Sequence, residues 1–166
     1  MNFGIMDFSL SLQKKLEERG LEMLKNMAET EGVQTLDNNV VLHVLEDGPD
    51  GPGQGARPTI GSTVLIHYHG TLPDGTVFDS TLGGEPVKMP LAQVIPGWRD
   101  GVLAMHEGET AMLGVPPDQA YGDNGTPDGR IPGGSTLFFK VQLVKVLNAG
   151  IGGTPSLLGP DGKPMN

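Results

Sequence analysis

The sequence contains no cysteine and few basic residues. Without cysteine the chain forms no disulfide, carries no thiolate nucleophile and offers no thiolate ligand to zinc, which fits a reducing compartment. We therefore expect a cytoplasmic protein, with the nucleus as the alternative. The 11 Lys and Arg residues are outnumbered by 20 Asp and Glu residues. Because nucleic-acid binding needs clustered positive charge, we expect no nucleic-acid partner.

Long apolar runs are also missing. Asp7 interrupts the first apolar run before it reaches the length of a secretion signal, and no positive charge precedes it. No stretch approaches the roughly 20 apolar residues that cross a bilayer, so we expect a soluble protein with no membrane partner. The length of 166 residues fits one ordinary domain with appendages.

Apolar side chains recur three to five positions apart over residues 8–30, with charged residues between them. This spacing predicts an amphipathic helix, with Asp7 or Ser9 as its N-cap and Gly20 as a weak point in its middle. Residues 1–35 would then be a helical extension. Two roles stay open for it, packing onto its own domain or joining two copies as a homodimer.

Strand patterns dominate the next hundred residues. The apolar run at 40–45 predicts an edge strand, and the Gly/Pro-rich stretch 48–58 marks a loop near a domain boundary. From Thr63 the period is two, so that Val64, Ile66 and Tyr68 share one strand face.

A turn at Pro73-Asp74-Gly75 predicts an antiparallel partner for that strand, with Gly75 at positive φ. Residues 110–115 and 137–143 alternate and predict two more strands, while residues 97–105 after Pro96 suit a short helix. The predicted fold class is α+β, an antiparallel sheet wrapped around a short helix. Residues 148–166 return to Gly/Pro-rich composition and are expected to form a flexible tail.

Several separated segments occur in one order and spacing: Tyr68, Asp74-Gly75-Thr76-Val77-Phe78-Asp79-Ser80, Val94-Ile95-Pro96-Gly97-Trp98, Ala120-Tyr121-Gly122 and Thr136-Leu137-Phe138-Phe139. Together they resemble the FKBP family of peptidyl-prolyl cis/trans isomerases. The resemblance covers about residues 57–147 and places the isomerase domain at 36–147. Some family members use a longer helical extension for dimerisation.

The resemblance implies a proline-binding cleft between the sheet and the short helix. Trp98 would form its floor, and Tyr121 and the Ile95 N–H would hold peptide carbonyls. Asp79 would either act on the twisted carbonyl or orient the neighbouring aromatic rings. The implied catalytic residues are Tyr68, Phe78, Asp79, Ile95, Trp98, Tyr121 and Phe139, and the implied ligand-binding residues are Val87, Val94, Thr126 and Ile131. Without the resemblance, we would interpret the aliphatic and phenylalanine residues of this set as ordinary core residues, and Tyr121 as a surface packing residue.

The sequence departs from the family at the rim of that cleft. Residues 82–85 lack an arginine that pairs with the aspartate in many relatives, and a bulky aromatic is missing near Val87. The loop 125–132 is one residue longer, with Thr126 where histidine is frequent and Arg130 where an aliphatic residue is common. A rapamycin-type macrolide is therefore a less secure ligand than a proline-containing polypeptide client.

The resulting hypothesis is an enzyme that accelerates X–Pro rotation and assists folding, without a cofactor. A noncatalytic module that captures proline peptides is the alternative. His67 and His69 share a strand face, but no third ligand is evident and we expect no metal.

Overall fold

The computed structural model describes the backbone of residues 3–147 and the side chains of residues 13–147. The predicted tail at 148–166 lies outside the described residues. In chain order the elements are α1 (Phe3–Ala28), β1 (Gln34–Thr35), β2 (Val41–Glu46), β3 (Thr63–Thr71), β4 (Val77–Ser80), β5 (Val87–Pro90), the 3₁₀ turn η1 (Leu91–Gln93), α2 (Pro96–Leu103), β6 (Thr110–Val115), the 3₁₀ turn η2 (Pro117–Gln119) and β7 (Leu137–Val146). None of the described helices is long and apolar enough for a bilayer.

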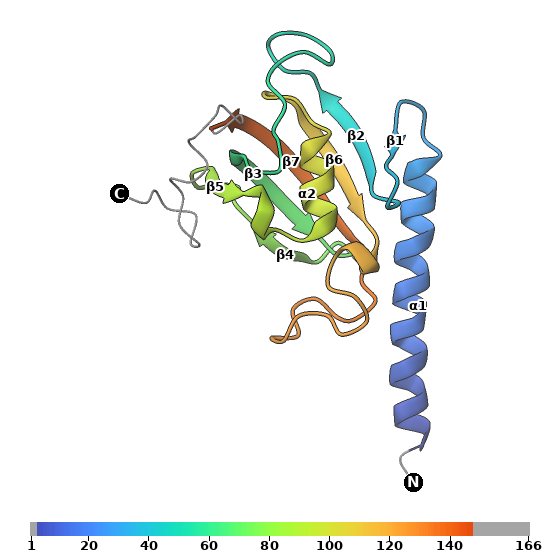
Figure 1. Ribbon diagram of the computed structural model, residues 1–166. Coiled ribbons are helices and arrows are strands. Elements are labelled where there is room, and N and C mark those ends of the chain that lie inside the picture. The colour runs from blue at the N-terminus through green and yellow to red at the C-terminus, as the bar shows by residue number, and fades with distance from the viewer. Residues whose placement is uncertain (1–2, 148–166) are drawn as a thin grey trace.

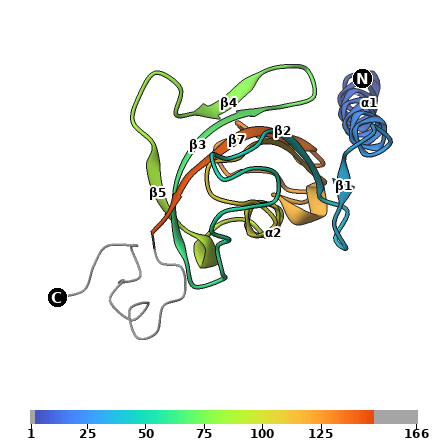
Figure 2. The ribbon, with the colours of Figure 1, turned by 90° about the horizontal axis from the view of Figure 1, so that it is seen from above.

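The strands form one antiparallel sheet in the order β1-β2-β6-β7-β3-β4, with β5 also paired to β3. The sheet curves around α2, which lies across its concave side (Figures 1 and 2). This architecture confirms the predicted fold class. Gly75 has a φ of 89° in the turn between β3 and β4, as its predicted role requires. The run predicted at an edge is β2, which has the two-residue β1 on its outer side.

Two glycines of α2 allow it to lie close to the sheet. A Cβ on Gly97 would come within 2.3 Å of Val115 Cγ1, and one on Gly101 within 2.1 Å of Leu113 Cδ2. The two glycines are four residues apart, so they share the helix face that meets β6. This close approach turns the adjacent Trp98 into the core, where the side chain is 3% exposed.

Helix α1 runs beside the sheet rather than within the core around α2 (Figure 2). Its Leu24 packs with Val41 and Phe138 in a second, smaller cluster on the other face of the sheet. A Cβ on Gly20 would lie 3.0 Å from Thr136 and Pro73, so this glycine permits close docking of the helix. The extension therefore packs onto the domain of its own chain. These contacts do not test dimerisation.

The predicted start of α1 is wrong. The helix begins at Phe3 instead of near residue 8, and therefore Asp7 and Ser9 lie inside it and neither is its N-cap. No proline interrupts the first turns, so the helix extends toward the N-terminus beyond residues 8–30, whose spacing predicted it.

Candidate active site

Four aromatic rings form a continuous edge-to-face chain between α2 and the sheet. Trp98 of α2 meets Tyr68 of β3 at a centroid distance of 5.4 Å and Phe139 of β7 at 5.7 Å. Phe139 in turn meets Phe78 of β4 at 5.5 Å. All three interplanar angles lie between 84° and 85°, a geometry that the ring quadrupoles favour.

Gly70 of β3 leaves the room that two of these rings occupy. A Cβ at this position would lie 2.6 Å from Phe78 Cζ and 2.9 Å from Phe139 Cε1. Gly70 pairs with Phe139 on one side and Asp79 on the other. The strand backbone therefore supports the rings directly, without a side chain between them.

Tyr68 and Asp79 form the polar edge of the aromatic set. The Tyr68 hydroxyl donates to Asp79 Oδ2 at 2.7 Å. Burial, and then the hydrogen bond and charge of Asp79, raise the pKa of Tyr68 well above its ordinary value, so the hydroxyl stays protonated and donates. Asp79 thereby has a fixed partner on the neighbouring strand.

These side chains line a cleft of about 410 Å³. Its lining residues are Tyr68, Phe78, Asp79, Met89, Gln93, Val94, Ile95, Trp98, Tyr121 and Phe139. The structure thus brings together every residue of the implied catalytic set, together with Val94. Met89 of β5 and Gln93 of η1 are additional members that the sequence interpretation missed.

Tyr121 and Ile95 enter the cleft from different elements of the fold. Tyr121 follows η2 and is 41% exposed. Ile95 is the N-cap of α2, and amides at the start of a helix have no acceptor within the helix.

Three implied ligand-binding residues do not line the cleft. Ile131 is buried in the main core, and Val87 packs against the same core. Thr126 is used within its own loop, where its hydroxyl donates to Asp128 Oδ1 at 2.8 Å and accepts from the Ile131 N–H at 3.0 Å. Their side chains are committed to packing or to loop geometry.

His67 and His69 precede and follow Tyr68 along β3, and they lie on the opposite, outer face of the sheet. His67 Nδ1 lies 2.9 Å from Thr81 Oγ1, and His69 Nδ1 lies 2.9 Å from Ser80 Oγ. Within the side chains described from residue 13 onward, no three His, Asp or Glu residues are grouped as metal ligands. The two imidazoles instead connect β3 to the end of β4.

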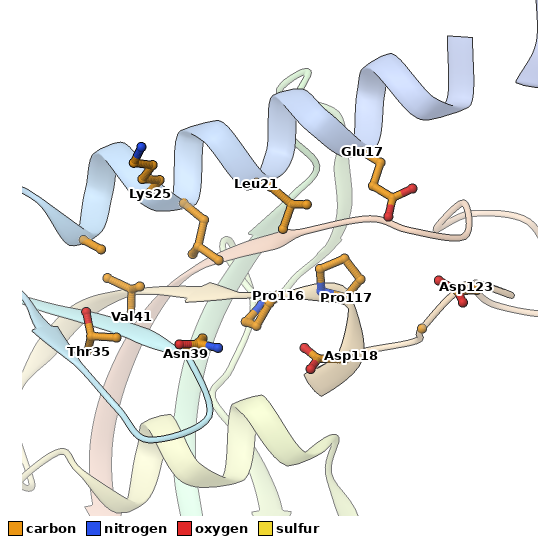
Figure 3. Close-up of a pocket in the computed structure, with 13 residues that line it drawn as sticks. Glu17, Leu21, Lys25, Thr35, Asn39, Val41, Pro116, Pro117, Asp118 and Asp123 are labelled. Atoms are coloured by element: carbon orange, nitrogen blue, oxygen red, sulfur yellow. The ribbon is translucent and has the colours of Figure 1, made fainter. Parts of the chain in front are cut away.

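A larger hollow of about 560 Å³ lies between α1 and the loops that follow β6 (Figure 3). Leu21 faces it from the helix, opposite Pro116, Pro117 and Asp118 (Figure 3). This hollow is open and has none of the aromatic chain, so its size does not make it the better candidate. The aromatic cleft is the chemically specific site.

A comparison with protein families tests the resemblance on which the interpretation of the aromatic cleft depends. Residues 54–144 match the family model described as FKBP-type peptidyl-prolyl cis-trans isomerase. The chain belongs to this family. The resemblance inferred from the separated motifs is thereby confirmed.

Individual relatives agree with the FKBP assignment. The chain is 40% identical over 134 residues to the probable FKBP-type isomerase FkpA of Neisseria meningitidis serogroup B, covering 80% of this chain and 47% of the relative. It is 41% identical over 116 residues to the isomerase Mip of Coxiella burnetii, covering 69% of this chain and 48% of that protein. The crystal structure of FkpA from Escherichia coli superimposes with a TM-score of 0.70 at 35% identity, over 86% of this chain and 70% of that one.

The chain spans about half the length of these curated relatives. They also correct the expected location. FkpA and Mip are periplasmic isomerases of bacteria, which contradicts a cytoplasmic or nuclear assignment. The inference from cysteine failed because a chain without thiols has nothing to oxidise and is compatible with either redox environment.

Proposed function

We propose that this chain is a peptidyl-prolyl cis/trans isomerase that accelerates rotation about X–Pro bonds of polypeptide clients and assists their folding. The observation that carries the proposal is the edge-to-face chain of Tyr68, Trp98, Phe139 and Phe78 lining one cleft with Asp79. Membership of the FKBP family supports it.

The reaction breaks no covalent bond. Rotation about the X–Pro amide crosses a barrier of roughly 18–20 kcal/mol, because the twisted form loses amide resonance. A catalyst must bind this twisted form more tightly than either planar form, and each 1.36 kcal/mol or so of difference gives about tenfold in rate.

The cleft suits that requirement through its dry, aromatic interior. The planar amide is more polar than the twisted one, so removal of water by Trp98 and Phe139 favours the twisted state. In this scheme the Ile95 N–H and the Tyr121 hydroxyl hold flanking carbonyls. Asp79 acts through Tyr68, whose ring it orients, because its Oδ2 already accepts the Tyr68 hydroxyl hydrogen bond.

The proposal divides the chain into an extension at 1–35, an isomerase domain at 36–147 and a tail at 148–166. A homodimer through α1 is part of it, and light scattering tests that part. If the full-length protein and a version without residues 1–32 both have the mass of a single chain, the dimer is refuted. A rapamycin-type macrolide is proposed as a ligand of the same cleft, with lower affinity expected because Val87 and Thr126 do not supply rim contacts.

The experiment is a proline-isomerisation assay on a peptide and on a refolding protein limited by X–Pro rotation. Concentration-dependent acceleration, blocked by the macrolide and accompanied by a change in Trp98 fluorescence, is the expected result. Saturable peptide binding without acceleration would instead establish the alternative, a noncatalytic proline-binding module. An absence of both acceleration and binding would refute the function altogether.

A further inference from the structure

Arg130 connects two walls of the cleft that are far apart in the sequence. It lies in the segment 121–134, called the cleft loop below, which leads from η2 to β7. Its Nη2 donates a hydrogen bond to the carbonyl oxygen of Phe78 in β4. Phe78 lines the cleft with its ring, and the next residue, Asp79, lines it with its carboxylate.

The backbone around Arg130 is held so that its side chain can make this contact. Asp128 Oδ1 accepts from the Arg130 N–H at 3.0 Å and from the Thr126 hydroxyl at 2.8 Å. The Thr126 N–H donates to the Ile131 carbonyl at 2.9 Å, and the Ile131 side chain is buried in the core. Arg130 therefore projects from a closed turn that is anchored on its far side.

The start of the same loop carries Tyr121 into the cleft. The Gly125 N–H donates to the Tyr121 carbonyl at 3.1 Å, and the Gly134 N–H donates to the Gly122 carbonyl at 2.8 Å. These bonds close the loop on itself, and a displacement of its tip is transmitted to Tyr121. The Arg130 contact is thus a link between Tyr121 on one wall and the end of β4 on the other.

Resting on the function proposed above, we propose that Arg130 is a positioning residue that fixes the cleft loop against β4. It sets the gap between Tyr121 and Asp79, and with it the fit of peptide residues that flank the proline. This chain lacks an arginine at residues 82–85, so the guanidinium beside β4 comes from the opposite loop instead. Arg130 does not line the cleft, and its effect falls on substrate binding rather than on rotation.

The test compares Arg130→Met and Arg130→Lys with the wild-type full-length chain. Met keeps much of the aliphatic stem and removes every donor, while Lys keeps one donating group. Arg57→Met is the matched control, because Arg57 Nη2 donates to the Leu103 carbonyl at 3.0 Å, away from the cleft lining. Steady-state isomerase kinetics and amide hydrogen exchange are measured on all four proteins.

We expect Arg130→Met to raise KM about threefold to tenfold with kcat nearly unchanged, the size that a partly solvated hydrogen bond to a charged group supports. Arg130→Lys should recover part of the loss, and Arg57→Met should leave KM unchanged. Exchange should accelerate across residues 121–134 in Arg130→Met alone. Such acceleration shows that a hydrogen-bonded link is lost, whatever the catalytic outcome.

Two failures are distinguishable. If the wild-type chain does not accelerate isomerisation, the proposed function fails, and the exchange data still report whether the link exists. If the wild-type chain is active but Arg130→Met matches Arg57→Met in both KM and exchange, the positioning role is refuted. A fall in kcat at constant KM would also refute it, since that would place Arg130 in the rotation step.

Discussion

Gly70→Ala tests whether the aromatic cleft depends on the backbone beneath it. The new Cβ would lie 2.6 Å from Phe78 Cζ, whereas ordinary contact begins near 3.4 Å. The Phe78 ring must therefore move by roughly 1 Å, and the Phe139 ring at 2.9 Å must also give way. Overpacking of this kind costs about 1–3 kcal/mol of folding stability.

Catalysis should suffer more than stability. A displacement of about 1 Å at a reacting site can cost up to about a hundredfold in rate, so we expect kcat/KM to fall by about tenfold to a hundredfold. Isomerase kinetics, thermal unfolding and near-ultraviolet circular dichroism measure the two effects side by side.

Gly114→Ala is the matched control for this prediction. Its Cβ would lie 2.5 Å from Leu24 Cδ1 at the α1 contact, which is a comparable clash on a strand glycine outside the cleft. We expect this variant to lose stability while retaining kcat/KM. Equal losses of activity in the two variants, at equal losses of stability, would refute the idea that Gly70 acts through the rings.

Three further predictions follow from hydrogen bonds and packing. Tyr68→Phe removes the donor to Asp79 and should lower kcat/KM about threefold to tenfold in the isomerase assay, with the aromatic packing retained; unchanged kinetics would remove the hydroxyl from the scheme. Gly20→Ala places a Cβ 3.0 Å from Thr136 and should loosen α1, seen as faster amide exchange in the helix with near-normal activity; unchanged exchange would contradict close docking. Hydrogen bonds from the Arg130 N–H and the Thr126 hydroxyl lower the pKa of Asp128 from its ordinary value of 3.8. The stabilisation of the cleft loop by Asp128 is therefore present above pH 3.8 and is lost as the pH falls through the lowered pKa. An NMR titration that gives the Asp128 carboxyl a pKa at or above 3.8 would contradict this.

The floor of the cleft was predictable because its residues follow regular patterns. Phe139 belongs to a strand with period-two alternation, and Trp98 follows Pro96 and Gly97 at the start of a short helix. These patterns fix which side of each element faces the core, and the order of the motifs supplied the rest. The same alternation placed Tyr68 on one strand face with Val64 and Ile66.

The missed residues depend on contacts that no local pattern encodes. Met89 lies on the four-residue strand β5, which pairs only with β3. A strand of this length is too short to show a clear period in the sequence. Gly20 was interpreted from helix propensity as a weakness, because the side chains that it approaches, Pro73 and Thr136, are far away in the sequence. Arg130 was noted only as an unusual residue, since nothing in the sequence reveals that its guanidinium reaches β4.

Floor and rim of this FKBP cleft are therefore held by different kinds of interaction. The rings around Trp98 are buried and supported by sheet backbone and helix packing, so their positions change only at a cost to the whole fold. Tyr121 is positioned by a loop whose geometry rests on Asp128 and Arg130, both of them exposed. On the proposed function, we expect substitutions in the loop to alter which peptides fit without unfolding the domain, and substitutions beneath the rings to alter the rate of rotation. The measurable consequence is that a loop substitution raises KM at nearly constant kcat, whereas Gly70→Ala lowers kcat.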